Sequence, residues 1–227
     1  MQSIRSRVLD ANKWIVDKGL VKLTWGNVSF YDREGGKVYI KPSGINLSLA
    51  TNDQVSCVDI SGNVLSGLTP SVDTPTHLEI YKAFDNANCI IHTHSKYATI
   101  FAQSGHAVPC LGTTHSDYFC GDIPCVPHPL GPEALENYER NTGRIICEFY
   151  RQQGIDPTNI QACLVKGHAP FVWAPNIEAA LENAYVLEII SEYAYKTLIL
   201  NPESSLSKEI LDKHFFRKHG TGKYYGQ

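Results

Sequence analysis

An apolar strand that ends in two histidines is the feature that most constrains this chain. Residues 89–91 are apolar, His92 and His94 follow, and the segment 95–105 has the spacing of a helix. Residues i and i+2 of a strand project to the same side, so the pair presents two imidazoles on one face. The pattern predicts a buried strand that leaves the core at His92 and passes directly into a helix.

His168 lies in a similar setting, shortly after the apolar stretch 162–165. Three histidines with a fourth position left open are typical of a catalytic zinc site. The His-x-His pair alone is equally compatible with one buried and one loop histidine, and His168 favours the metal interpretation. Asp73 opens an expected helix, where a carboxylate is favoured as a cap, so by itself it indicates only a helix start.

Three stretches could bind an anion. They are TWGNVS at 24–29, KPSG at 41–44 and the position of Ser71, where small polar side chains lie beside backbone N–H groups. Lys41 adds a positive charge, and phosphate sites are built from such parts. Taken alone, the same residues are more typical of ordinary turns and loops than of an anion site. Neither G-x-x-x-x-G-K-[ST] nor a G-x-G-x-x-G after a strand is present, so no nucleotide cofactor is expected.

The order of the expected elements predicts an α/β protein. Strands are expected at 27–32, 37–41, 55–60, 63–67 and 88–94, short strands at 107–119 and 122–127, and a strand running into a loop at 161–173. Helices are expected at 4–18, 73–84, 95–105, 131–152 with an interruption at Gly143, 176–200 and 207–220. Without a repeat or linker, residues 1–227 are expected to form a single three-layer domain, a mostly antiparallel sheet with helices on both sides.

Composition narrows the function classes. The net charge is −3 and charges of both signs are interspersed, so no nucleic-acid partner is indicated. The seven cysteines include no C-x-x-C pair, which is more typical of reduced thiols than of a disulfide framework. No apolar run approaches the roughly 20 residues of a membrane span, and the N-terminus lacks the apolar block of a signal peptide. A cytoplasmic protein without a membrane partner is expected.

Together these motifs resemble the L-ribulose-5-phosphate 4-epimerases of the class II aldolase family. The stretches that carry the resemblance follow one another along essentially the whole chain: TWGNVS, IKPSG, PSVDTPTH, IIHTHS, GTTHSDYF, GHAPFVW and YYGQ. GTTHSDYF and YYGQ are typical of the epimerase branch. The histidines and the phosphate loops are typical of the wider family.

The resemblance implies a divalent metal ion, zinc or another such as manganese, on His92, His94 and His168. Asp73 occupies the acidic position that the epimerases use as a further ligand and that the fuculose-phosphate aldolases fill with a catalytic glutamate. The same resemblance assigns the substrate and its phosphate to a set of small residues with a lysine nearby: Gly26, Asn27, Ser43, Gly44, Ser71 and Lys41. Val72 departs from the pattern, because the epimerases carry a second serine there.

Asp117 and Tyr225 match the two acid/base residues of the epimerases. The resemblance also implies a homotetramer with active sites at subunit interfaces, into which Tyr225 reaches from a neighbour. The implied reaction interconverts L-ribulose 5-phosphate and D-xylulose 5-phosphate. The bond between carbons 3 and 4 is cleaved in a retro-aldol step, the aldehyde fragment turns over, and the bond forms again on its other face. Two proton carriers at the carbon 4 oxygen serve the two orientations.

Three alternatives stay open at this stage. An aldolase of the same family would release the two fragments, and Asp73 in place of glutamate, together with Asp117 and Tyr225, favours the epimerase. A dehydratase on the same scaffold is disfavoured for the same reason. A non-catalytic binding domain could have lost its metal ligands freely, whereas all three histidines are present here.

Overall fold

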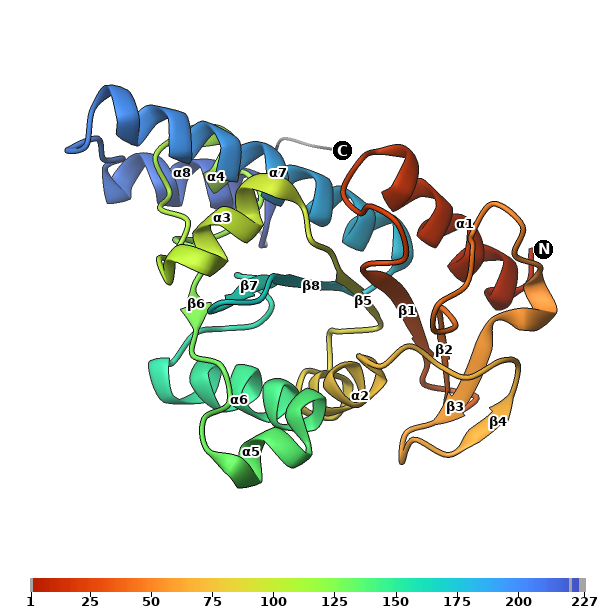
Figure 1. The fold of residues 1–227 in the computed structure, drawn as a ribbon. Coiled ribbons are helices and arrows are strands. Elements are labelled where there is room, and N and C mark those ends of the chain that lie inside the picture. Colours follow the sequence, from red (N-terminus) through yellow and green to blue (C-terminus); the bar gives the residue numbers. More distant parts are fainter. Residues whose placement is uncertain (1, 221, 225–227) are drawn as a thin grey trace.

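Figure 1 shows the fold in a computed structural model, which describes residues 2–220 and 222–224. The strands are β1 (Asn27–Asp32), β2 (Lys37–Ile40), β3 (Ser56–Asp59), β4 (Val64–Ser66), β5 (Cys89–His92), β6 (Cys125–Val126), β7 (Ala162–Val165) and β8 (Pro170–Ala174). The helices are α1 (Ile4–Asp17), α2 (Thr74–Ala83), α3 (Lys96–Ser104), α4 (Thr113–Ser116), α5 (Pro132–Glu136), α6 (Tyr138–Gln153), α7 (Ile177–Leu200) and α8 (Lys208–Lys218), with a 3-10 turn at Asn52–Gln54.

A single eight-stranded sheet runs through the molecule in the order β4-β3-β2-β1-β5-β8-β7-β6. All its neighbouring strands are antiparallel except β6 and β7. Helices α1, α3 and α7 cover one face, and α2 and α6 cover the other (Figure 1). Each face buries its own apolar cluster, which explains why the central strands β5, β7 and β8 are buried at every position. The predicted three-layer α/β fold with a mostly antiparallel sheet is confirmed.

The segment after β5 is held in place by a residue that is distant in the sequence. Helix α3 begins after Ser95, whose side chain makes no capping hydrogen bond. The carboxylate of Glu188 on α7 takes that place, because it accepts hydrogen bonds from the backbone N–H groups of Tyr97 and Ala98 at 2.9–3.1 Å. A carboxylate at a helix N-terminus satisfies otherwise free N–H groups and is favoured by the helix dipole. This contact holds the strand–loop–helix segment that carries His92 and His94.

Gly143 does not interrupt the helix that contains it, contrary to the sequence-based prediction. The break lies at Asn137, which separates α5 from α6. Gly143 is buried inside α6, and a Cβ there would lie 2.7 Å from the backbone oxygen of Thr76 on α2. The glycine is therefore needed for the close approach of α6 to α2.

Two further sequence-based predictions were wrong in detail. The segment 107–119, expected to be short strands, contains helix α4 and only an isolated bridge between Val108 and Ile123. The segment 161–173, expected to end in a loop, is a hairpin in which β7 pairs with β8. Among the described residues, no helix combines the length and the apolar character that crossing a membrane requires.

Candidate metal and anion site

One end of the sheet gathers most of the predicted site residues. The start of β1, the ends of β2 and β5 and the start of β8 meet there, because these neighbouring strands are antiparallel and paired in register, Asn27 with His92 and His92 with Phe171. The N-terminus of α2 lies at the same end, and the residues that lead into it line the same cavity. The segments 24–27, 41–44, 71–73 and 92–94 and the turn at His168 therefore surround one cavity of about 360 Å³.

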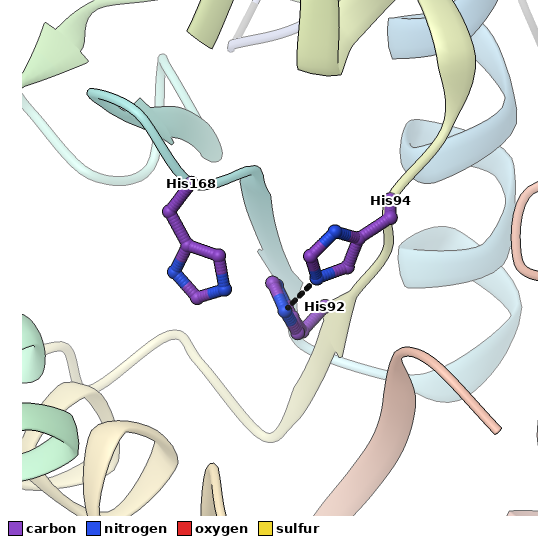
Figure 2. A group of neighbouring side chains, drawn as sticks. All are labelled: His92, His94 and His168. Carbon is purple, nitrogen blue, oxygen red and sulfur yellow. Dashed lines mark hydrogen bonds between the residues drawn. The ribbon is translucent and has the colours of Figure 1, made fainter. Parts of the chain in front are cut away.

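The three histidines converge on one point of this cavity (Figure 2). A nitrogen atom from each ring of His92, His94 and His168 lies within 4.8 Å of the others. His92 Nε2 and His94 Nε2 are 3.1 Å apart. His92 is the last residue of β5, His94 follows in the loop, and His168 lies in the turn between β7 and β8. The convergence expected from the sequence is present.

The chemistry of these rings fits a divalent metal ion. His92 Nδ1 lies 2.9 Å from the carbonyl oxygen of Pro170, and the Nδ1–H donates to it, so the lone pair of Nε2 faces the cluster. His168 Nδ1 is buried without a hydrogen-bond partner in the described chain. Burial, followed by the neighbouring imidazoles, lowers the pKa of His94 and also that of His168, the latter to about 4. Neutral imidazoles are the ligating form, and a three-histidine set suits zinc and other nitrogen-preferring ions.

Asp73 lines the same cavity at the N-terminus of α2. It does not cap the helix with its side chain. Instead, Asp73 Oδ2 accepts a hydrogen bond of 2.7 Å from Asn27 Nδ2, which also donates to Ser71 Oγ at 3.0 Å. Burial raises the pKa of Asp73, but the charges of His92 and His77 and the Asn27 hydrogen bond outweigh it, so the net pKa is lowered. The group is an anion beside the histidines, although it lies outside the 4.8 Å cluster.

A further part of the cavity lining is suited to an anion. Lys41 is 3% exposed, and its ammonium donates only to the carbonyl oxygens of Thr24 and Pro42 within the described chain, at 3.2 and 3.3 Å. Burial lowers the pKa of Lys41, and the charge of Asp73 partly opposes that effect. A buried cation whose hydrogen-bond partners are all uncharged favours a ligand of opposite charge. Four small residues complete this wall: Gly26, Ser43, Gly44 and Ser71.

Val72 lines the cavity and is 65% exposed. It follows Ser71 directly, at the position where the resembling epimerases carry a second serine. Its isopropyl group thus occupies a place on the anion side of the cavity where a hydroxyl could donate a hydrogen bond.

Asp117, one of the two predicted acid/base residues, does not line this cavity. Asp117 ends helix α4, where Arg217 of α8 holds it with two hydrogen bonds of 2.9 and 3.1 Å and His214 adds a third of 3.1 Å. Burial raises the pKa of Asp117, but the hydrogen bonds from Arg217 and His214 outweigh this, so the carboxyl is held as an anion. Tyr225 lies outside the described residues.

Two aromatic residues near the histidines were missed by the sequence analysis. Trp25 is half exposed, lines the cavity and places its ring 6.0 Å from that of His94. Tyr138, the first residue of α6, has its ring 6.3 Å from that of His168, and the charge of Asp73 contributes to the raised pKa of its phenol, after burial. Trp25 lies within the stretch TWGNVS, whereas no local pattern indicates Tyr138.

Fold and site define an α/β protein with a three-histidine cavity at one end of an antiparallel sheet. Its sequence matches the family described as the class II aldolase and adducin N-terminal domain over residues 6–195. The chain belongs to this family.

Solved structures share the fold over nearly the whole chain. An L-fuculose 1-phosphate aldolase has a TM-score of 0.80 at 24% identity, covering 96% of this chain and 97% of that one. YgbL of Klebsiella pneumoniae has a TM-score of 0.73 at 22% identity, covering 92% and 96%. The L-fuculose-1-phosphate aldolase of Thermus thermophilus has a TM-score of 0.68 at 20% identity, covering 89% and 98%. At these identities the likeness concerns the fold.

Proposed function

We propose that this chain is a zinc-dependent L-ribulose-5-phosphate 4-epimerase. One observation carries the proposal: three neutral imidazoles line the same cavity as a buried ammonium, whose hydrogen-bond partners in the described chain are all uncharged. Such a cavity suits a substrate with a metal-binding oxygen pair at one end and a phosphate at the other. A non-catalytic binding domain on this fold has no use for three converging histidines.

The phosphate end of the substrate is assigned to Lys41 and the small residues around it. The ammonium of Lys41 attracts the dianion, and the hydroxyls of Ser43 and Ser71 can donate to its oxygens. Gly44, where a Cβ would meet no atom within 4 Å, leaves room for the ligand to approach the backbone, and Gly26 contributes to the same lining. This anchor retains the aldehyde fragment while it turns over, so that re-addition competes with escape.

The reacting end of the substrate is assigned to His92, His94, His168 and Asp73. A divalent ion held there supplies Lewis-acid stabilisation of negative charge on the substrate oxygens. Asn27 keeps the Asp73 carboxylate oriented toward this end through the 2.7 Å hydrogen bond. Trp25, beside His94, shields one side of the site from water.

Proton transfer at the carbon 4 oxygen is assigned to Asp117 and Tyr225. Asp117 is held as an anion by Arg217 and His214, which suits a base. It lies on the α4–α8 side rather than on the cavity wall. We therefore infer that the residue serves the cavity of a neighbouring subunit, as in the homotetramers of the epimerases that this sequence resembles.

The test is incubation of the zinc-loaded protein with L-ribulose 5-phosphate, followed by detection of D-xylulose 5-phosphate. Release of glycolaldehyde phosphate without epimer would instead favour a sugar-phosphate aldolase, the activity named for several proteins of similar fold. The subunit arrangement has its own test. His94→Asn and Asp117→Asn chains, each inactive alone, should recover part of the activity when they are unfolded together and reassembled, because mixed interfaces contain one intact site.

A further inference from the structure

A buried row of polar side chains runs between strand β1 and helix α2, beneath the cavity. Asn27 and Ser29 are two residues apart on β1 and therefore project to the same face of the sheet. Asp73, His77 and Tyr81 are spaced by four residues along α2 and therefore share one face of the helix. The two rows meet: Asn27 bonds Asp73, and Ser29 bonds both His77 and Tyr81.

The inner part of this row has no contact with solvent. Ser29, His77 and Tyr81 are all 0% exposed. Ser29 Oγ lies 2.7 Å from His77 Nδ1 and 2.6 Å from the Tyr81 hydroxyl oxygen. His77 Nε2 is buried without a hydrogen-bond partner in the described part of the chain. Buried polar groups are almost always hydrogen-bonded, so this nitrogen needs an explanation.

The directions of the hydrogen bonds follow from counting protons. Burial raises the pKa of Tyr81 well above its usual value, so its hydroxyl keeps a proton, and Ser29 is the side chain placed to accept it. Ser29 Oγ then has its own proton left to donate, and its other partner is His77 Nδ1. An accepting Nδ1 places the proton of a neutral imidazole on Nε2. The group without a partner is therefore an N–H donor.

Asp73 is the charged acceptor at this end of the row, where Asn27 Oδ1 is also buried without a partner among the described residues. Asp73 and His77 lie one turn apart on α2, where the backbone N–H of His77 donates to the Asp73 backbone oxygen at 3.2 Å. The two groups also interact electrostatically: burial lowers the pKa of His77 to about 3, and the nearby Asp73 carboxylate partly opposes that effect. The Asp73 carboxylate uses one oxygen for Asn27 and keeps the other for a second donor.

We propose that Tyr81, Ser29 and His77 form a positioning relay for Asp73. The hydroxyl protons of Tyr81 and Ser29 point toward His77 and fix its proton on Nε2, and this N–H bonds the Asp73 carboxylate, directly or through one buried water molecule. Asn27 and His77 then hold the carboxylate from two sides. The relay rests on the proposed role of Asp73 in the site, and its three members act only through that residue.

The first test is a double-mutant cycle between His77→Leu and Asp73→Ala. The probes are zinc affinity, measured by competition with a chromophoric chelator, and the kcat for L-ribulose 5-phosphate. His77→Leu alone should lower the zinc affinity, the kcat or both by about 10–100-fold, because a metal ligand that loses its hydrogen-bond partner typically has an effect of this size. It should cause no further loss in the Asp73→Ala background. The KM should stay unchanged, because Lys41 and the phosphate wall are untouched.

The conservative variant separates positioning from packing. His77→Gln keeps an acceptor for Ser29 and an N–H₂ donor, and it should recover most of the loss. Tyr81→Phe removes the donor that orients Ser29 and should give a smaller loss of the same kind. Its matched control is Tyr150→Phe, which removes another buried hydroxyl. Tyr150 lies on α6, and its hydroxyl donates a hydrogen bond of 2.5 Å to the backbone oxygen of Ala162. The control should lower stability but leave zinc affinity and kcat unchanged.

The outcomes distinguish the relay from the site on which it rests. If Asp73→Ala alone leaves both zinc affinity and kcat at the wild-type level, the assignment of Asp73 is wrong and the relay is wrong with it. If Asp73→Ala is defective and His77→Leu multiplies that defect, His77 acts through packing and the relay alone is overturned. Equal effects of Tyr81→Phe and Tyr150→Phe on kcat would lead to the same conclusion.

Discussion

Gly26 connects the stability of the fold to the metal site, and its replacement by alanine tests that connection. The residue has φ +73°, in the left-handed region, and directly precedes β1. A Cβ built on it would lie 2.6 Å from the backbone oxygen of His92 and 2.6 Å from Val21 Cγ1. The displaced backbone would be that of the segment 92–93, between two of the three converging histidines. Gly26→Ala should therefore reduce both stability and zinc affinity.

The expected magnitude has three parts. A left-handed φ costs a non-glycine residue about 1–2 kcal/mol. The reduced freedom of the unfolded chain returns roughly 0.4–1 kcal/mol of this. The overlap with His92 and Val21 adds the cost of overpacking, about 1–3 kcal/mol. We expect a total loss of about 2–4 kcal/mol in the free energy of unfolding, measured by urea denaturation at a fixed protein concentration.

Gly19→Ala is the matched control. Gly19 has φ +72°, almost the same backbone conformation, but a Cβ there would meet no atom within 4 Å. The Gly19→Ala variant should lose about 1 kcal/mol or less in the free energy of unfolding, and its zinc affinity should stay at the wild-type value. If the two variants are equally stable and bind zinc equally well, the close contact between Gly26 and His92 does not exist in solution, and the reasoning is refuted.

Two further predictions concern the same cavity, and a third concerns three histidines, of which His168 lines it. His94→Asn should remove bound metal and activity while circular dichroism stays unchanged, and full metal occupancy by elemental analysis would show that His94 is not a ligand. Val72→Ser should strengthen phosphate binding by ~1.5–3 kcal/mol, seen as a lower KM, whereas an unchanged KM would show that Val72 does not face the phosphate. Metal-free protein should lose stability between pH 6.5 and about 4, because the buried His77 and His115 and the partly buried His168 take up protons only on unfolding; equal urea midpoints at pH 7 and pH 5 would contradict this. In the folded state the pKa is about 3 for His77, about 4 for His115 and about 4 for His168, and burial is the main cause that lowers each of them.

The parts of the fold that the sequence predicted are those with a strong local pattern. The apolar stretch before His92 indicated a buried strand because it has no polar side to expose, and β5 is buried at all four positions. The alternation of side chains at 27–32 correctly predicted strand β1, and the apolar stripe at 176–200 correctly predicted helix α7. Histidines at two strand ends then led to the observed cluster, since strand ends at one edge of a sheet lie close together.

The parts that were missed depend on contacts between distant segments. Nothing local distinguishes residues 170–174 as a strand, because β8 exists through its pairing with β5 and β7. Helix α4 is a single turn. Asp117 at its end is hydrogen-bonded by Arg217 of α8, which lies 100 positions later in the chain. The sequence analysis did not single out His77, because its link to Ser29 joins residues 48 positions apart. Sequence periodicity carries no information on such pairs.

The distribution of charged groups gives a reason for dividing the machinery between two places. Asp73 lies beside three imidazoles that must stay neutral and near a buried ammonium. A second carboxylate fixed in this cavity would raise the pKa of the first and compete with a phosphate for Lys41. Asp117 instead keeps its charge through Arg217 and His214, away from that cavity wall. Under the proposed function, a base supplied across a subunit interface would approach the substrate without joining the metal's own ligand set, and the reassembly experiment tests this arrangement.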